Sequence, residues 1–254
     1  MGGVFLTGAS SGIGAALAAQ YARRGAVLGL VARRADTLAA LAARLDTTTV
    51  TYAADVADIA AMRAAADDFI ARHGVPGIVV ANAGVSAGTL GGDPDDLPAL
   101  ERVLRTNLVG LAATLAPFVA PMRARGNGIL AGIASVAGFR GLPGAGAYSA
   151  SKAAAITWLE SLRVELRGSG VAVVTVCPGY VDTPMTRVNR YRMPFLLPAD
   201  EAARRIARAI DSRRSFAVVP WQMALAGRAL RLLPNVLFDA LAARGGRKPR
   251  GLPL

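Results

Sequence analysis

Cysteine and histidine are nearly absent from this sequence of 254 residues, which holds one of each, Cys177 and His73. A single cysteine excludes an internal disulfide framework and fits a reducing compartment. One cysteine and one histidine do not furnish the usual ligands of a catalytic zinc ion. We therefore expect a site without metal, with Cys177 as a small buried residue and His73 at a helix end before Gly74.

The sequence also lacks a secretion signal and a full-length membrane span. Met1-Gly2-Gly3 precedes the first apolar run with no basic region, so we expect no signal peptide and a cytoplasmic protein. One stretch, residues 106–122, carries no charge but contains Pro117 and Pro121. It falls short of the ~20 residues that a span requires, so a buried helix is expected there.

Acidic residues are scarce only in the C-terminal part of the chain. The net charge is +12, yet residues 1–186 hold 15 basic and 13 acidic side chains, whereas residues 187–254 hold 14 and 4. Aromatic residues make up 6% of the chain and do not form a stacking platform among these arginines, so no nucleic-acid partner is expected. A hydrophobic content of 53% supplies the core of one large α/β domain.

A glycine-rich turn follows the first apolar run, Val4-Phe5-Leu6, and precedes an alanine-rich segment. Glycines there allow the backbone to approach a bulky anion, and a following helix directs free N–H groups and its positive dipole end toward it. The spacing is G-x-x-x-G-x-G rather than the general G-x-G-x-x-G, and an ordinary tight loop is the alternative. The predicted pyrophosphate cradle comprises Gly8, Ser10, Ser11, Gly12, Ile13 and Gly14.

Two rival motifs do not fit this turn. Residues 8–12 match the G-x-S-x-G nucleophile elbow, which requires an Asp and then a His later in the chain, but His73 is the one histidine. A phosphate-binding P-loop ends in G-K-[ST], whereas Ala15 follows Gly14.

The second expected strand, residues 26–32, ends in Arg33 and Arg34. In dinucleotide folds the residues at this strand end contact the adenosine ribose. An acidic residue there favours NAD, and an arginine favours the 2′-phosphate of NADP. We therefore expect NADP(H) to be preferred, with NAD(H) as the alternative if the two arginines are merely solvated.

Further strands alternate with helices, which predicts a doubly wound parallel sheet. The expected strands are 48–53, 77–81, 128–134, 171–177 and 216–219, and the expected helices are 36–45, 59–72, 100–125 and 198–212. Ligands of such sheets bind beyond the carboxyl ends of the strands. The cofactor-binding residues expected at those ends are Asp55, Val56, Asn82, Ala83, Gly84, Pro178, Gly179, Val181 and Thr183.

Two of these residues have alternative structural roles. Asp55 suits an adenine amino group or the N-cap of the next helix, and Thr183 suits a carboxamide or a helix cap.

Tyr148 and Lys152 lie four residues apart in a helical segment, so they share one face. An ammonium near a phenol favours the phenolate, which predicts a lowered pKa for Tyr148 and an acid–base role. Ser135, at the end of the strand 128–134, is expected nearby.

Taken in order, these motifs resemble the short-chain dehydrogenase/reductase family over about residues 3–220. The motifs are Thr7 to Gly14, Asp55, Asn82-Ala83-Gly84, Asn107, Ser135, Tyr148, Lys152 and Pro178-Gly179. The resemblance implies a single Rossmann-like domain with about seven parallel strands, helices on both faces and a nicotinamide cofactor. It places Arg33 at the position associated with NADP. Ser11 stands where some NADP-dependent members carry a second basic residue.

The resemblance also implies catalytic roles. Tyr148 would exchange a proton with the substrate oxygen, Ser135 would hold that oxygen, and Lys152 would bind the nicotinamide ribose and depress the tyrosine pKa. Asn107 would support a proton relay through water. The substrate residues it implies are Phe139, Leu142, Tyr180 and Met185, which predicts an apolar carbonyl compound or alcohol.

The chain is thus divided into a cofactor-binding and catalytic domain, 1–220, and a basic amphipathic extension, 221–254. The extension fits a membrane-surface helix or a cover over the substrate site or a subunit interface, and we favour the cover. Residues 245–254 are expected to be frayed. A homodimer or homotetramer is expected from the resemblance.

Three functions follow from the sequence. The first is an NADP(H)-dependent oxidoreductase of hydrophobic ketones or secondary alcohols. The others are a peripheral membrane reductase of a lipid-like substrate and a non-catalytic NADP-sensing protein.

Overall fold

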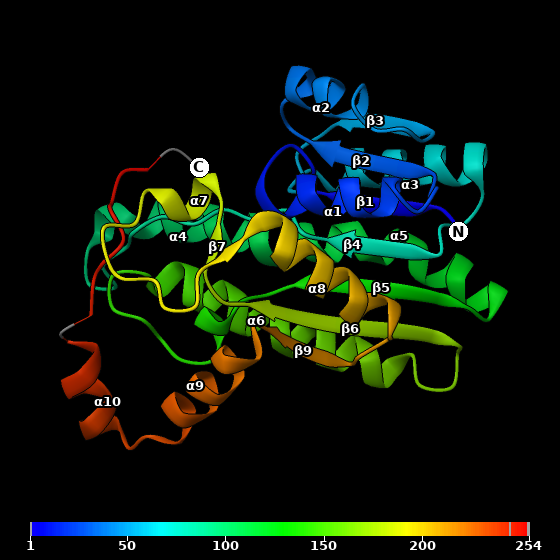
Figure 1. The fold of residues 1–254 in the computed structure, drawn as a ribbon. Coiled ribbons are helices and arrows are strands. Elements are labelled where there is room, and N and C mark those ends of the chain that lie inside the picture. Colours follow the sequence, from blue (N-terminus) through cyan, green and yellow to red (C-terminus); the bar gives the residue numbers. More distant parts are fainter. Residues whose placement is uncertain (1, 244, 253–254) are drawn as a thin grey trace.

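Seven short apolar segments form one parallel sheet, which lies at the centre of the molecule (Figure 1). The computed structural model describes residues 2–243 and 245–252. The strands, in their order across the sheet, are β3 (Thr49–Ala53), β2 (Leu28–Ala32), β1 (Val4–Thr7), β4 (Ile78–Ala81), β5 (Gly128–Ile133), β6 (Val171–Pro178) and β9 (Phe216–Val219). The direction of winding changes between β1 and β4, and ligands of open parallel sheets bind beside such a switch point.

Each strand supplies apolar side chains to both faces of the sheet, as a parallel sheet covered on two sides requires. In β1, Val4 and Leu6 enter one core cluster and Phe5 enters the other. The Phe5 ring lies 5.6 Å from that of Phe69 and 4.9 Å from that of Phe118, measured between centroids. The two cores are therefore separated by the sheet itself.

Helices cover both faces. On one side lie α1 (Gly12–Ala22), α2 (Ala35–Ala42) and α8 (Ala199–Asp211), and on the other α3 (Ile59–His73), α5 (Gly110–Arg125) and α6 (Gly146–Glu165). The predicted doubly wound fold is confirmed. The predicted bounds differ from the observed ones by a few residues at most, apart from the helix expected at 100–125.

That expected helix is three consecutive helical pieces. They are α4 (Leu97–Leu104), a five-residue π-helical turn (Arg105–Val109) and α5. Residues 94–125 are long and apolar enough to cross a membrane by length and composition alone. Leu115, Phe118 and Met122 of α5 are fully buried in the core beneath the sheet, so this stretch is a core helix, as the sequence predicted.

The remaining elements are short or lie in the C-terminal extension. At the carboxyl end of the sheet are 3₁₀ turns at Pro94–Asp96 and Val136–Gly138, the pair β7 (Val181–Asp182) and β8 (Leu197–Pro198), and α7 (Pro184–Arg187). The extension contains α9 (Trp221–Leu232), which lies at this same end beside β9, and α10 (Asn235–Ala242), which lies beyond α9 (Figure 1).

Candidate active site

The glycine turn between β1 and α1 has the backbone geometry that anion binding needs. Gly8 and Gly12 have φ values of 67° and 54°, a region that side-chain-bearing residues rarely adopt. A Cβ atom on Gly8 would lie 2.7 Å from the Ala83 Cα atom, so the turn packs directly against the end of β4. Ser11 is the N-cap of α1, but its side chain makes no capping hydrogen bond. The positive end of α1 is thus directed into the cavity described below.

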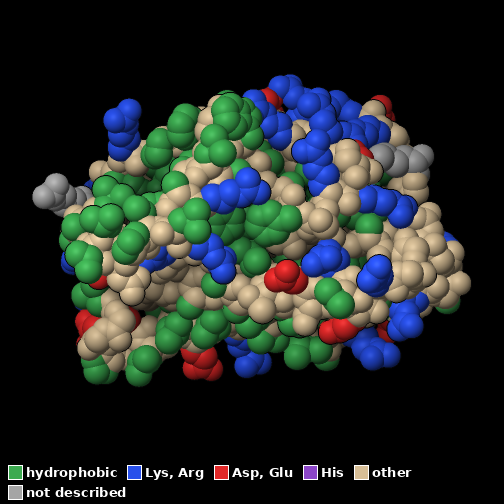
Figure 2. Space-filling model, turned by 90° about the horizontal axis from the view of Figure 1, so that it is seen from below, with side chains coloured by type: hydrophobic (Ala, Val, Ile, Leu, Met, Phe, Trp, Pro, Cys, Tyr) green, Lys and Arg blue, Asp and Glu red, His purple; other side chains and the backbone are tan. Residues whose placement is uncertain are grey.

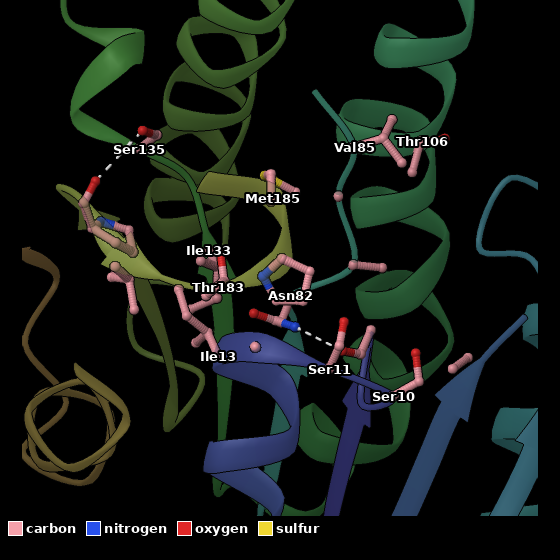
Figure 3. A pocket seen from close by; sticks show the side chains of 18 of the residues that line it. Ser10, Ser11, Ile13, Asn82, Val85, Thr106, Ile133, Ser135, Thr183 and Met185 are labelled. Atoms are coloured by element: carbon pink, nitrogen blue, oxygen red, sulfur yellow. Dashed lines mark hydrogen bonds between the residues drawn. The ribbon is translucent and has the colours of Figure 1, made fainter. Parts of the chain in front are cut away.

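Asn82 holds this turn in place. Its Nδ2 atom donates to the carbonyl oxygens of Thr7 and Gly8, at 3.0 and 3.3 Å (Figure 3). In return, the backbone N–H groups of Asn82 and Ala83 donate to Thr7 Oγ1 at 3.2 and 3.3 Å. Asn82 is therefore a structural residue of the cradle as well as part of the cavity wall.

Arg33 and Arg34 lie together at the adenosine end. Arg34 Nη2 donates to Ser10 Oγ at 3.3 Å, and Arg33 Nη1 lies 4.0 Å from Asp55 Oδ2. The Arg33 and Asp55 side chains are 47% and 43% exposed, so water screens this ion pair and leaves Arg33 able to change partner.

Asp55 takes part in a local turn rather than the predicted alternative of a helix N-cap. Its Oδ1 atom accepts from Ala57 N at 3.0 Å, whereas the N-cap of α3 is Asp58. Its neighbours Ala54 and Val56 line the cavity.

At the other end, α6 directs Tyr148 and Lys152 toward Ser135, which follows β5. Ser135 Oγ accepts from Ala137 N at 3.1 Å and donates to the Pro178 carbonyl oxygen at 3.5 Å (Figure 3). Burial raises the pKa of the Tyr148 hydroxyl, and a hydrogen bond with Ser135 partly opposes this increase. The predicted lowering of this pKa is wrong for the structure, because desolvation outweighs every favourable contact of the phenolate.

Lys152 is held by the backbone at the end of β5 and lies near the Tyr148 ring. Its Nζ atom donates to the Ile133 carbonyl oxygen at 2.8 Å and lies 5.8 Å from the centroid of the Tyr148 ring. Burial lowers the pKa of Lys152 to about 8. The buried thiol of Cys177 has its pKa raised to about 12, again by burial, so it is protonated and behaves as the small core residue that was expected.

Asn107 lies in the π-helical turn and is fully buried. Its Oδ1 atom accepts from Val85 N at 2.8 Å, and its Nδ2 atom donates to the Val85 carbonyl oxygen at 3.0 Å and to Ser151 Oγ at 2.9 Å. The side chain thus joins the segment after β4 to α6. It does not line the cavity, and the predicted water relay through Asn107 stays a prediction.

The segment after β6 forms the opposite wall. Pro178, Gly179, Val181 and Thr183 all line the cavity, as predicted. Thr183 also begins α7, where its backbone N–H donates to Thr186 Oγ1 at 3.0 Å. Both of its predicted roles therefore remain compatible with its position.

One cavity of about 380 Å³ joins these groups. It runs from Ser10 and the arginines to Ser135, with Ile13 and Thr183 between them (Figure 3). The predicted cofactor and catalytic residues that line it are Gly8, Ser10, Ser11, Gly12, Ile13, Arg33, Arg34, Val56, Asn82, Ala83, Gly84, Ser135, Tyr148, Lys152, Pro178, Gly179, Val181 and Thr183.

Of the predicted cofactor-binding residues, Gly14 and Asp55 do not line the cavity. A Cβ atom on Gly14 would overlap the Gly8 carbonyl oxygen, so Gly14 serves the close packing of turn and helix.

The residues present fit a nicotinamide dinucleotide. The cradle admits a pyrophosphate because its two left-handed glycines and the helix N-terminus leave N–H groups and space for an anion. The cations at one end and the tyrosine–serine pair at the other match the two ends of such a molecule.

Of the four predicted substrate residues, Met185 alone lines this cavity. The Phe139 ring packs on Gly227 of α9 and lies 6.1 Å from the Phe216 ring. Tyr180 packs 6.3 Å from Tyr191, whose pKa is raised to about 12 by burial and by the nearby charges of Tyr180 and Tyr148.

Leu142 belongs to the loop before α6. Its backbone N–H donates to Ser149 Oγ at 3.4 Å.

The C-terminal extension was expected to cover the substrate site or an interface, but its last residues were expected to be frayed; in the structure part of this last segment crosses the substrate side. Residues 246–252, here called the strap, follow α10 and return to the cavity mouth (Figure 1). Lys248 Nζ donates to the Met185 carbonyl oxygen at 3.1 Å, and Gly88 N donates to the Pro249 carbonyl oxygen at 3.0 Å.

Further contacts secure both ends of the strap. Gly246 packs on the Tyr191 ring, and the Arg250 guanidinium pairs with Asp93 and Asp96. The prediction of a frayed end is therefore wrong for residues 245–252, because polar and ionic contacts hold them. Residues 253–254 lie outside the described part of the chain.

Comparisons with known proteins agree with this geometry. The short chain dehydrogenase family profile matches residues 3–193. An uncharacterized oxidoreductase of Myxococcus xanthus (strain DK1622) is 40% identical over 245 residues, which cover 94% of this chain and 95% of that protein. Cis-4-hydroxycyclohexanecarboxylate dehydrogenase of Sinomonas cyclohexanicum is 35% identical over 225 residues, covering 84% of this chain and 90% of that protein.

Solved structures show the same relationship. A short-chain dehydrogenase from Sphingobium yanoikuyae in complex with NADPH superposes with a TM-score of 0.79 at 29% identity, covering 96% of each chain. Levodione reductase gives a TM-score of 0.78 at 26% identity, covering 87% of this chain and 97% of that one. The chain belongs to the short-chain dehydrogenase family, and it is an NAD(P)-dependent oxidoreductase.

Proposed function

We propose that the protein is an NADP(H)-linked oxidoreductase that interconverts an apolar carbonyl compound and its secondary alcohol, with Tyr148 as the general acid and base. The observation that carries this proposal is the position of Tyr148 and Ser135 at one end of the cavity whose other end holds Arg33 and Arg34. The proton-transfer group and the cations that would select the cofactor thus lie at opposite ends of the same cavity.

The chain's own residues would act as follows. The nicotinamide ring supplies or accepts the hydride at its C4 atom. Tyr148, protonated because burial raises its pKa, gives its proton to the substrate oxygen in reduction and takes it back in oxidation. Ser135 Oγ would hold the same oxygen, since its hydroxyl lies near enough to that of Tyr148 to oppose the rise in the tyrosine pKa. Lys152, fixed at the Ile133 carbonyl oxygen, supplies a donor beside the ribose.

An apolar substrate fits the lining of this end. Val85, Ile133, Val181 and Met185 contribute aliphatic or thioether surface to the lining of the cavity that also holds Tyr148. The nearby guanidinium of Arg140 is bound to backbone carbonyls at the end of α9 rather than free for an acidic group of a substrate. Two relatives bear the names levodione reductase and cis-4-hydroxycyclohexanecarboxylate dehydrogenase, and both names support a cyclic ketone or alcohol.

The preference for NADP(H) is supported by the two arginines and by the relative solved with NADPH. A 2′-phosphate would exchange the screened contact of Arg33 with Asp55 for a stronger charge-assisted one.

The preference is tested by steady-state kinetics with NADPH and NADH on a panel of ketones of increasing apolar size. Replacing both arginines (Arg33→Ala with Arg34→Ala) is expected to raise the KM for NADPH about 10- to 100-fold while changing the KM for NADH little. Arg63→Ala, on the exposed side of α3, is the matched control. An unchanged ratio of the two cofactors in the double variant contradicts the 2′-phosphate assignment.

A further inference from the structure

Helix α9 has one face against the catalytic segment and an apolar face in water. On the inner face, Met223 packs on Gly179, where a Cβ atom would come within 2.7 Å of Met223 Cγ, and Gly227 packs on the Phe139 ring. On the outer face, Trp221, Leu225 and Leu232 are 63%, 57% and 83% exposed. The spacing of these three residues, four and seven apart, puts them on one stripe of the helix.

Helix α10 extends this apolar stripe. Val236 is 80% exposed, and Leu237 and Leu241 are each 57% exposed, while Phe238 is buried. We call the outward residues of both helices the α9–α10 face. They are Trp221, Leu225, Leu232, Val236, Leu237 and Leu241. Soluble monomers rarely leave so many large apolar side chains together in water, so such a patch marks an interaction site.

The two helices of the α9–α10 face are held in a fixed arrangement by Arg140. Arg140 Nη1 donates to the carbonyl oxygens of Leu230 and Leu233 at 2.8 and 2.7 Å, and its Nη2 atom donates to Asn235 Oδ1 at 2.7 Å. Its guanidinium also lies 4.1 Å from the centroid of the Phe238 ring. The Arg140 side chain thus provides hydrogen-bond donors to the free carbonyl groups at the end of α9, and it holds α10 beside α9.

The charges around this face are cationic. Arg228 lies on the same stripe as Leu225 and Leu232. Arg231 lies about one helical turn after Arg228, and both arginines are exposed. Among the ion pairs of residues 2–243 and 245–252, neither arginine takes part. Asp239 is the one acidic residue within α9 and α10. In Figure 2, which shows the underside of the molecule, hydrophobic side chains gather over the half where these helices lie, with a few basic side chains among them.

This charge pattern distinguishes between two occupants. A two-fold dimer would place this face of one copy on the same face of the other. The Arg228 and Arg231 side chains of both copies would then share one interface with a single acidic residue from each, Asp239. An anionic bilayer instead places phosphates beside the arginines and the acyl boundary beside the leucines.

We propose that the α9–α10 face docks on the surface of an anionic lipid bilayer. Trp221 and the leucines enter the boundary between headgroups and acyl chains, and Arg228 and Arg231 bind lipid phosphates. Because Gly179 and the segment after Ser135 lie under α9, docking would put the substrate end of the cavity about one helix diameter, ~10 Å, from the membrane. Docking does not depend on the cofactor preference or on catalysis.

The test is co-sedimentation of the full chain with vesicles of phosphatidylcholine alone or mixed with phosphatidylglycerol, at low and high salt. We expect binding to the mixed vesicles at low salt. The double variant Leu232→Glu with Val236→Glu is expected to bind them at least about 100-fold more weakly. The double variant Arg228→Gln with Arg231→Gln is expected to bind about 30-fold more weakly and with less dependence on salt.

Control variants come from exposed apolar residues elsewhere on the surface. Ile59 and Leu97 are 59% and 58% exposed, so Ile59→Glu and Leu97→Glu should bind vesicles as the unchanged protein does. A fluorescence measurement adds a local readout, because the chain contains two tryptophans. In a Trp158→Phe variant, emission from Trp221 should shift to shorter wavelength when mixed vesicles are added.

Failure of the unchanged protein to bind mixed vesicles at low salt overturns the proposal. Equal binding by Leu232→Glu with Val236→Glu also overturns it. Analytical ultracentrifugation tests the alternative occupant, a second copy of the chain. If Leu232→Glu with Val236→Glu changes the oligomeric state, and the unchanged protein does not bind vesicles, a second copy covers the face.

Discussion

At the scale of single residues, burial controls the chemistry of the site. Tyr148 and Lys152 are both enclosed, and burial raises the pKa of the phenol and lowers the pKa of the amine. Each shift favours the neutral form, as desolvation requires. The pair therefore begins the reaction with a phenol that can donate its proton, rather than with a phenolate.

Replacing Tyr148 with phenylalanine removes the proton donor and little else. Because the ring keeps its packing, we expect cofactor binding to change little while kcat falls about 100- to 10,000-fold. Stopped-flow binding and steady-state turnover measure the two quantities. Tyr52→Phe is the control, since the Tyr52 hydroxyl bonds to Asp68 on the far edge of the sheet. Full turnover by Tyr148→Phe excludes Tyr148 as the donor.

Lys152 predicts a pH dependence of stability. Its pKa falls from 10.5 to about 8 on folding, so between these values the unfolded chain binds more protons and the free energy of unfolding rises with pH. Below about pH 8 the lysine is charged in both states, and the cost of burying the charge is fully present. In Lys152→Met this dependence disappears.

Urea unfolding of both proteins at about pH 7 and about pH 10 measures this effect. We expect the stability difference between Lys152→Met and the unchanged protein to shrink by about 3 kcal/mol over that range, as an order of magnitude. Taking the difference largely cancels the opposite trend from Cys177, whose raised pKa lowers stability as pH rises above 9. A difference that is constant with pH contradicts the assignment.

At the scale of elements, the strands and their exit turns were predictable because the signals are local. Glycines after β1, asparagine after β4 and serine after β5 each mark the end of an apolar run. The π-helical turn was not predictable, since an apolar helix pattern continues through Arg105–Val109. Its consequence is specific: Asn107 turns inward and bonds to Val85 and Ser151 instead of facing the cavity.

The strap was missed for a different reason. Its contacts join residues far apart in sequence, such as Gly88 with Pro249, and its composition of glycine, proline and basic residues is that of a frayed end. A Cβ atom on Gly88 would overlap the Lys248 carbonyl oxygen, so the close approach depends on that glycine.

Displacing the strap should affect the substrate more than the cofactor. Gly88→Val, or Arg250→Ala, is expected to raise the KM of apolar substrates up to about 10-fold, because the loops at the substrate end lose their support. The Kd of NADPH should change less than about twofold, since the hydrogen bonds and ion pairs of the strap go to Met185, Gly88, Asp93 and Asp96 rather than to the glycine turn. Arg72→Ala, which breaks a comparable ion pair on α3, is the control.

Kinetics and equilibrium cofactor binding distinguish the possible roles of the strap. Equal weakening of NADPH and substrate would show that the strap supports the whole cavity rather than its substrate end.

At the scale of the whole molecule, one sheet places the cofactor-binding groups and the proton-transfer groups at the carboxyl ends of its strands. The β1–β2 side supplies the anion cradle and the arginines, whereas the β5–β6 side supplies Ser135 and the wall opposite Tyr148. The C-terminal extension adds α9 against the catalytic segment and the strap across the cavity mouth. Three of the four substrate residues expected from the sequence lie outside the cavity lining, and one of them, Phe139, packs against Gly227 of the extension instead.

Hydride transfer tests the central claim most directly. The purified protein would be incubated with NADPH deuterated at C4 and an apolar cyclic ketone, and the alcohol analysed by mass spectrometry and NMR. We expect deuterium at the carbinol carbon, and loss of the product in Tyr148→Phe. Alcohol that carries no deuterium from either face of the labelled cofactor would contradict the proposed reaction.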